Sequence, residues 1–474
     1  MIRIIDKTII YLSLIFLFLQ GSGILVGNMI IRMFYFILMV SLLYFVIKDN
    51  FIFFKSIKKI IIKTPLKYLF IFLLFYLVIS FVLCIFHQST WGNLLKGFLL
   101  HYIFGIIPIC LFFSYIIFHK YITIFNITKI FIFLFWLNTI LSIIVLIADI
   151  FNFDFLTNII NFICNIRNFN DGIDINPYST RLKGFFEEPG FYAGFIYIFL
   201  PFTYFLTSSK VKLYKNKFIN LILKKTFVPL VWINIILTKS PIFLLLCGLL
   251  TIICYYKELK KFFIKHSVIS IIILLTTLFI MMLGLNFLKA SESYLSRIGS
   301  VFQSKNIIDL IMLEPSLATR IVCYIYSIKI GLSHLLTGVG IKSIDIHLLN
   351  SYYSGLLPLT PEIITHIDKY KAGLENIFYV NAIAYYLFAE SGIIGVYLYF
   401  KFYINMLSSL NKIKNNIPKL SFDYVFLKSS FFTIIGLLIY FFYDSRFIQQ
   451  EIYFISTLIS MYIYMLNNKK YGRE

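Results

Sequence analysis

The most chemically active passage of the chain lies between residues 181 and 194, where charged side chains alternate with glycines. It reads R-L-K-G-F-F-E-E-P-G-F-Y-A-G, and the residues that stand out are Arg181, Lys183, Gly184, Glu187 and Glu188. An arginine binds phosphate through two parallel hydrogen bonds, and the N-terminus of a helix favours an anion. The passage therefore predicts a cradle for a phosphate-bearing group.

A structural interpretation of the same passage stays open. Pro189 suits the first turn of a helix, and two acids just before it complement the positive end of the helix dipole. On this interpretation the charges only cap a helix that starts at Pro189.

Further arginines follow in a second passage, at Arg297 and Arg320. From 316 to 335 the pattern is helical and amphipathic. One stripe of this helix carries Arg320, Tyr324, Ser327, Gly331 and His334. The helix can lie in the membrane interface with its arginine reaching for water. Alternatively, it turns Arg320, and with it His334, towards a site shared with Arg181.

No metal or nucleotide site is expected. The seven histidines show no metal-ligand spacing, and Asp345-Ile-His347 is only a short pair. The acidic pair Asp171-x-x-Asp174 is not a D-x-D motif, and the chain has neither a P-loop nor G-x-G-x-x-G. We therefore expect metal-independent chemistry without a cofactor.

The elements that position these residues are membrane helices. The chain has 474 residues, of which 60% are hydrophobic and 14% charged, and its mean hydropathy of +0.88 excludes a soluble globular protein. Apolar runs of roughly 20 residues predict an all-α, polytopic helical membrane protein rather than a barrel. Twelve nearly charge-free spans are expected, at 8–25, 29–47, 67–86, 97–118, 130–150, 190–208, 226–238, 241–256, 267–288, 376–403, 425–443 and 452–466.

The charge is distributed unequally between alternate loops. One set of loops, with the helix ends that face it, holds 28 of the 43 Lys and Arg and 5 of the 21 Asp and Glu. The positive-inside rule makes that side cytoplasmic, with both termini inside. The lysine runs are explained by topology and anionic membrane lipids, so no nucleic acid is expected as a partner. The two long loops, 151–189 and 289–375, are then outer loops and form the predicted site within a single integral membrane domain, 1–474.

Four passages, in order, resemble the O-antigen polymerases (Wzy-type), within the wider group that includes the O-antigen ligases. They are R-x-x-G-F-F-x-E-P (181–189), T-K-S-P (238–241), an arginine and a glycine ahead of G-V-G (320–340), and N-x8-E-x-G-I-I-G (381–395). Together with twelve helices and two long outer loops, the likeness covers about two-thirds of the chain. In the ligases a histidine, thought to be the base, commonly stands where this chain has Asn381, which favours the polymerase.

The resemblance implies a metal-independent glycosyltransferase at the outer face of the bacterial cytoplasmic (inner) membrane, acting in O-antigen or related surface-polysaccharide biosynthesis. Its substrates would be oligosaccharide repeat units linked to undecaprenyl diphosphate, and a chain-length regulator would be a further partner. Arg181 and Arg320 would stabilise the departing diphosphate, and Glu188 or Glu187 would act as the general base. The expected substrate-binding residues are Lys183, Gly184, Arg297, Tyr324, His334 and Asn381.

Three alternatives remain at this stage. A ligase would move glycan onto lipid A core. A lipid-linked oligosaccharide flippase, which is a transporter, should carry charged residues within its spans, and here those spans are nearly charge-free. A non-catalytic assembly protein is compatible with the same composition.

Overall fold

The structure is a computed structural model. It describes residues 2–17, 23–26, 29–86, 89–151, 182, 189–208, 211–238, 240–265, 315–355, 359–371, 382–414, 417–418, 421–443 and 449–470.

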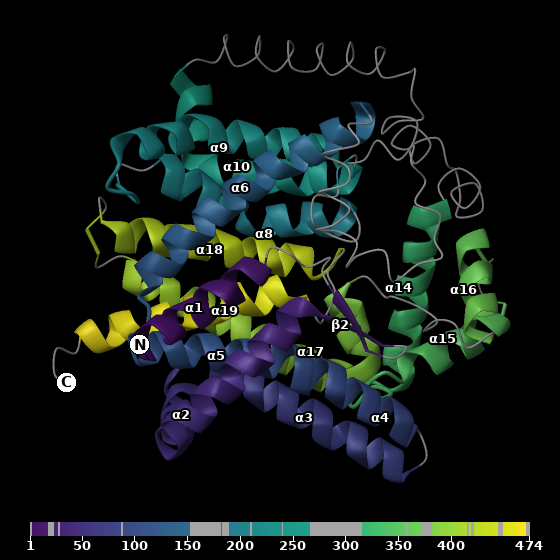
Figure 1. Cartoon of the computed structure of the whole chain (residues 1–474). Coiled ribbons are helices and arrows are strands. Elements are labelled where there is room, and N and C mark those ends of the chain that lie inside the picture. Colours follow the sequence, from purple (N-terminus) through teal and green to yellow (C-terminus); the bar gives the residue numbers. More distant parts are fainter. Residues whose placement is uncertain are drawn as a thin grey trace.

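Helices make up nearly all of the described chain (Figure 1). In order, the elements are α1 (Ile2–Phe16), β1 (Gly23–Val26), β2 (Met29–Arg32), α2 (Met33–Lys63), α3 (Leu66–Ile85), α4 (Trp91–Gly97), the π-helix η1 (Phe98–Ile106), α5 (Ile107–Phe118), α6 (Ile124–Phe151), α8 (Pro189–Ser208), α9 (Lys217–Leu237), α10 (Pro241–Lys265), α14 (Pro315–Ser333), α15 (Ile344–Tyr353), α16 (Pro361–Lys371), α17 (Ile383–Lys414), α18 (Phe422–Tyr440) and α19 (Gln450–Lys470).

Nine helices of the described chain are long and apolar enough to cross a membrane. They overlap nine of the expected spans, including the short one at 226–238, where α9 starts nine residues earlier and ends at Leu237. The helical membrane class is therefore confirmed, whereas the number twelve stays a prediction. The expected span 267–288 lies outside the described residues, and α1 and α19 are not among the nine.

The N-terminal expectation was wrong in one respect. A continuous helix was expected over 8–25, but α1 ends at Phe16, and β1 pairs antiparallel with β2 in the register Gly23 to Arg32. Glycine is costly inside a helix, and β-branched residues favour strands. The isoleucine- and valine-rich runs on either side of Gly27-Asn28 carry this hairpin signal, which hydropathy alone hides.

The segment 48–66 was expected to be a loop, and it is helical instead. α2 continues through it to Lys63, with a kink at Asn50, whose φ is 37°. After the kink the helix exposes large apolar side chains such as Phe51 and Ile62. Lysines alternate with these residues, so the segment is an amphipathic helix of the type that lies along a membrane surface.

Two helices form the centre of the molecule. α8 packs against α18 and α9, and α19 packs against α5, α17 and α8. Both helices are buried on nearly all sides, including their serines and threonines, such as Thr203 and Ser456. The surrounding helices α2, α3 and α10 instead leave large apolar side chains exposed, as expected for surfaces in contact with lipid.

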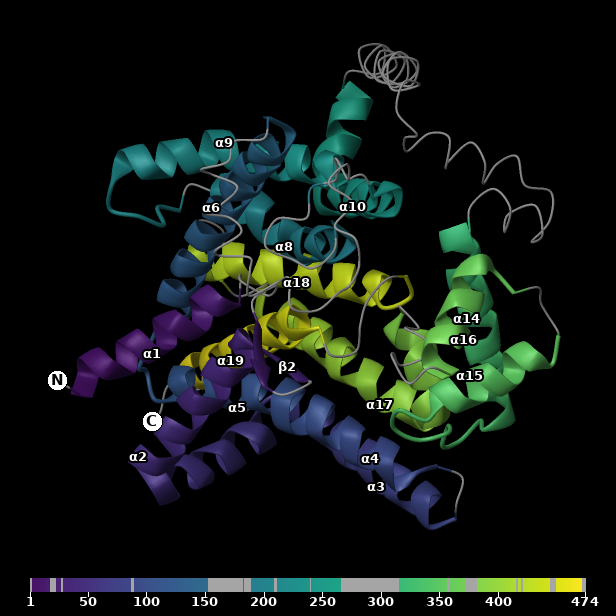
Figure 2. The same cartoon turned by 45° about the vertical axis from the view of Figure 1, so that its right-hand side comes forward.

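The molecule has two chemically different ends. Lysine-bearing helix ends meet at one of them: Lys401 of α17 lies over the ring of Tyr68 at the start of α3, and Lys428 of α18 lies 3.9 Å from Glu258 of α10. The start of α1 and the end of α19 lie on this side (Figure 1). α14, α15 and α16 lie at the opposite end, and both views agree on this arrangement (Figures 1 and 2).

α14 runs steeply across the direction of α8 and α18 (Figures 1 and 2). It shares a separate apolar core with α15 and α16, which includes Tyr326, Leu348 and Ile363 and touches α17 at Ala389. The described part of the segment 289–375 is thus largely helical, and α14, α15 and α16 form a layer attached to one end of the bundle.

Candidate functional site

The first two sequence passages meet at the end of α9. The backbone N–H of Leu182 donates to the carbonyl of Leu237 at 2.9 Å, and the Leu182 side chain is buried. In the first turn of α8, the Tyr192 hydroxyl donates to Oδ1 of Asn234 on α9 at 2.7 Å. Pro189 starts α8 and Pro241 starts α10, as the sequence predicted.

The last two passages also meet, at a kink in α17. The N–H of Val339 donates to the backbone carbonyl of Ala389 at 2.9 Å, and the N–H of Gly340 donates to the backbone carbonyl of Glu390 at 2.8 Å. In return, the N–H of Ile393 donates to the backbone carbonyl of Leu335 at 2.8 Å. Three backbone hydrogen bonds therefore fasten the turn after α14 into the interrupted helix.

We name the contact between the turn at 335–340 and the α17 kink at 389–393 the interlock. Glycines make this contact possible. Gly338 and Gly392 both have positive φ, 66° and 63°, which side-chain-bearing residues rarely adopt. A β-carbon on Gly338 would lie 2.3 Å from the carbonyl carbon of Glu390, and one on Gly392 would lie 2.5 Å from the backbone of Leu336. The turn and the helix approach each other too closely for any side chain.

A buried carboxyl lies beside the interlock. Glu390 is fully buried within the candidate span of α17, and its Oε2 accepts a hydrogen bond from the hydroxyl of Tyr76 on α3. The hydroxyl oxygen of Ser80, one turn further along α3, accepts a hydrogen bond from the N–H of Ile341 at 2.9 Å. The sequence predicted spans that are nearly charge-free. Glu390 corrects that description, because an ionisable residue inside a span marks a functional position by default.

α14 turns its polar stripe inward. Ser327 is buried, Arg320 and Tyr324 are half-buried, and Gly331 faces the ring of Phe388 on α17, which a β-carbon would strike. The apolar side chains off the stripe point the other way, and Leu332 is 62% exposed. The polar stripe therefore faces the protein, whereas the site shared with Arg181 stays a prediction, because Arg181 lies outside the described residues.

The end of α18 joins the two pairs of passages. The Tyr440 side chain fills the space beside Gly194 on α8. The backbone carbonyl of the next residue, Phe441, accepts a hydrogen bond from the N–H of Ala384 at the start of α17, at 2.9 Å. The Tyr324 hydroxyl on α14 donates to the carbonyl of Tyr443 at 2.5 Å. All four passages are thus connected at the end of the molecule opposite the lysines.

Buried polar groups lie at the same end, at the start of the central helix α19. Gln450 and Glu451 are each 1% exposed, and the Tyr440 hydroxyl donates to Oε1 of Gln449 at 3.2 Å. Within the described residues, the amide nitrogen and oxygen of Gln450 have no hydrogen-bond partner. A buried amide without a partner is costly unless a ligand or water satisfies it, and a sugar hydroxyl suits both of its atoms.

Sequence reasoning missed Glu390's partner and the whole Gln449–Glu451 group. The available signal was three polar residues opening an otherwise apolar helix, which was taken as the end of a short loop. We name the polar group formed by Tyr440, Gln449, Gln450 and Glu451 the α19 polar cluster.

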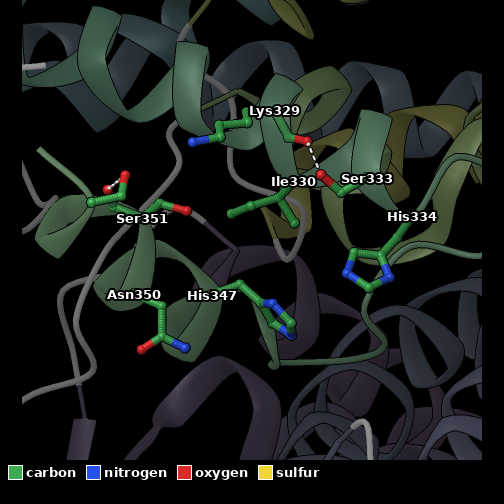
Figure 3. Close-up of a pocket in the computed structure, with 8 residues that line it drawn as sticks. Lys329, Ile330, Ser333, His334, His347, Asn350 and Ser351 are labelled. Atoms are coloured by element: carbon green, nitrogen blue, oxygen red, sulfur yellow. Dashed lines mark hydrogen bonds between the residues drawn. The ribbon is translucent and has the colours of Figure 1, made fainter. Parts of the chain in front are cut away.

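Three of the predicted site residues are described, and they do not form one site. Arg320 and Tyr324 are adjacent on α14, near the end of α18. His334 follows Arg320 by fourteen residues, so at 1.5 Å per residue it lies about 21 Å further along the helix. Its imidazole instead faces His347 of α15, with ring centroids 5.4 Å apart (Figure 3). The other predicted residues lie outside the described part of the chain: Arg181, Lys183, Gly184, Glu187, Glu188, Arg297 and Asn381.

Titratable groups near the interlock have displaced pKa values. Burial raises the pKa of Asp345 on α15 to about 6, against the opposing effect of the ammonium groups of Lys342 and Lys96. Burial and the neighbouring His334 lower the pKa of His347. Among the described residues, no three His, Cys, Asp or Glu side chains are grouped so as to hold a metal ion.

The comparisons with known proteins give no relative. No family model matches the chain, and no curated protein matches it.

Proposed function

We propose that the protein is an oligosaccharide repeat-unit polymerase that extends a surface polysaccharide on a polyprenyl diphosphate carrier. The observation that carries this proposal is the convergence of the four polymerase-like passages at one end of the bundle, through the contacts of Leu182, Val339 and Tyr324. This convergence supports the proposal because it brings residues up to about 200 positions apart to one end of the bundle, within reach of a common substrate.

The lysine-rich end supports the sidedness of this proposal. The positive-inside rule places the gathered lysines and both chain ends in the cytoplasm. The passages then face the outer side of a bacterial cytoplasmic membrane, where lipid-linked repeat units are joined on this proposal. α14, with its exposed Leu332, lies across the bundle at that surface.

The reaction joins two lipid-linked glycans. The hydroxyl oxygen of the acceptor sugar attacks the anomeric carbon of the donor, the bond from that carbon to the diphosphate oxygen breaks, and the hydroxyl proton passes to a base. Negative charge develops on the leaving diphosphate, and a guanidinium that stays protonated stabilises it. We assign this role to Arg320 and Arg181, and the role of base to Glu188 or Glu187.

The remaining residues have supporting roles in this proposal. Lys183 and Arg297 add positive charge near phosphate or sugar, and Gly184 admits the headgroup to the backbone. The α19 polar cluster, with the buried amide of Gln450, offers hydrogen bonds to sugar hydroxyls. No cofactor is required, because displacement of a diphosphate is driven by the lipid-linked donor itself.

A surface-glycan gel from the source organism tests the proposal. The gene is deleted and then restored as wild type, Arg320→Ala, Arg320→Lys or Lys371→Gln, the last being an exposed lysine of α16. We expect single repeats in the deletion strain and a full ladder with wild type and Lys371→Gln. Arg320→Ala and Arg320→Lys should lose polymer by roughly 100-fold or more at normal membrane levels, because the bidentate fork is absent from both.

Other gel patterns contradict the proposal. Long polymer left on the lipid carrier, with a bare acceptor, would identify a ligase. A full ladder from Arg320→Ala would remove the phosphate-binding role of this arginine.

A flippase is the second candidate, because Glu390 is a buried carboxyl inside a span. On that function the deletion strain would hold its repeat units on the cytoplasmic side, and Glu390→Gln would abolish transfer across the membrane. The backbone interlock at Glu390 and its bond from Tyr76 favour a fixed structural position over a moving one.

A further inference from the structure

A shallow pocket of about 220 Å³ lies between α14 and α15, at the far end of α14 from Arg320 (Figure 3). Its polar lining consists chiefly of Lys329, Ser333, His334, His347, Asn350 and Ser351. Ile330 is the one aliphatic side chain among the residues that line it.

The polar groups of this pocket are available to a ligand. The side chains of Lys329, His334, His347 and Asn350 make no hydrogen bond or ion pair within the part of the chain that the structure describes. The Ser333 hydroxyl is turned to the Lys329 carbonyl at 3.0 Å. One ammonium group, two imidazoles and one amide therefore line one pocket without satisfying one another, and the two imidazoles lie beside each other (Figure 3).

The combination is suited to a sugar with one negative charge. The lysine supplies a fixed positive charge, and the amide and imidazoles exchange hydrogen bonds with ring hydroxyls. Drug-sized ligands need about 300–1,000 Å³, so this smaller volume matches a single sugar residue. A lining with one aliphatic side chain does not suit an acyl chain.

We propose that this pocket binds one acidic sugar residue of the glycan that the protein elongates, an inference that rests on the function proposed above. Lys329 lies nine residues from Arg320, about 14 Å along the helix, so the pocket is separate from the arginine. It holds the chain at a second point and thereby keeps the glycan close to the reacting centre between additions.

Ligand-observed NMR on the full-length protein in phosphatidylcholine nanodiscs tests the pocket without any turnover. The probes are methyl glucuronide, which carries a carboxylate, and methyl glucoside, its neutral counterpart. We expect the glucuronide to bind at least about fivefold more tightly than the glucoside, and Lys329→Gln to remove most of that preference, because a hydrogen bond to a charged group is lost. Lys371→Gln, on α16 outside the pocket, is the matched control and should bind like wild type.

Acidification provides a second measurement. The titratable group that faces His347 is His334 on α14 (Figure 3), and Lys329 lines the same pocket. Because the pKa of His347 is lowered, its ring is neutral at pH 7.5 and gains charge only at lower pH. Glucuronide binding should strengthen between pH 7.5 and 5.5 in wild type and change less in His347→Gln.

Three results would overturn the inference: equal affinity for the two sugars, unchanged binding in Lys329→Gln, or tighter binding of glycerol 3-phosphate, which would indicate a lipid-headgroup site. The binding measurement needs no turnover, so its result is distinguishable from the result of the glycan gel. Lys329-dependent binding together with full polymer from Arg320→Ala would leave the pocket standing and remove the arginine's role. Binding that does not depend on Lys329, together with loss of polymer from Arg320→Ala, would remove the pocket alone.

Discussion

Asp345 gives the molecule a specific dependence on pH. Its pKa is raised from an ordinary value of 3.8 to about 6, so the folded protein holds a proton there that the unfolded chain releases. Stability from this group is therefore greatest below pH 4 and falls as pH rises through 6, by at most about 3 kcal/mol.

The variant Asp345→Asn should remove this dependence, because its amide resembles the protonated carboxyl. We expect its melting temperature in detergent to exceed that of wild type at pH 7.5, with the difference shrinking towards pH 4.5. Melting curves of both proteins across that range measure the effect. Parallel curves would show that Asp345 does not titrate as the structure indicates.

At the scale of elements, the joint between α14 and α17 depends on two glycines. Gly338→Ala and Gly392→Ala each place a methyl group within 2.5 Å of opposing backbone, where nothing flexible can give way. We expect each to cost more than about 3 kcal/mol or to prevent folding. Gly355→Ala is the matched control, because Gly355 has the same positive φ of 69° but open space around it, and it should cost only about 1 kcal/mol.

The measurement is the yield and melting temperature of each variant by fluorescence-detected size-exclusion chromatography. Similar losses in all three variants would mean that φ alone matters and that the close approach contributes nothing.

Helix starts that a proline marks were predictable from the sequence, because proline fixes its own φ in the first turn. Pro189 and Pro241 open α8 and α10 where expected, and the helical pattern from 316 matches α14. The paired strands β1 and β2 and the helix after Asn50 were not predictable in this way. Hydropathy alone does not distinguish an apolar strand from an apolar helix.

The site was less predictable than the helices. The G-V-G turn and the glycines of the last passage were singled out, but a glycine pattern does not reveal which backbone it approaches. Tyr76 and Glu390 are 314 residues apart, and a single sequence carries no signal that pairs them. His334 was assigned to the arginine site from its stripe alone, since a stripe gives direction around a helix but not distance along it.

For the whole molecule, the distribution of lysines makes a prediction about sidedness. Asp368 on α16 and Lys225 on α9 are both exposed, and the predicted topology puts them on opposite sides of the membrane. A cysteine at Asp368 should react with a membrane-impermeant maleimide on intact spheroplasts. A cysteine at Lys225 should react only after permeabilisation.

Both cysteine variants are made in a Cys164→Ser background, because Cys164 lies outside the described residues, whereas the other five cysteines are buried. Labelling of Lys225→Cys in intact cells, with protection of Asp368→Cys, would invert the molecule and place the α19 polar cluster in the cytoplasm.

The burial of α19 has a consequence for biosynthesis. This helix is not apolar enough to count among the membrane-crossing candidates, yet it lies at the centre, against α5, α8 and α17. All three precede it in the chain, so they have left the ribosome before α19 is made. Because α19 falls below the hydropathy of the nine candidates, the burial of its serines and threonines against helices that are already inserted contributes to holding it in the membrane. The central helix α19 is therefore inserted late, after the helices that surround it.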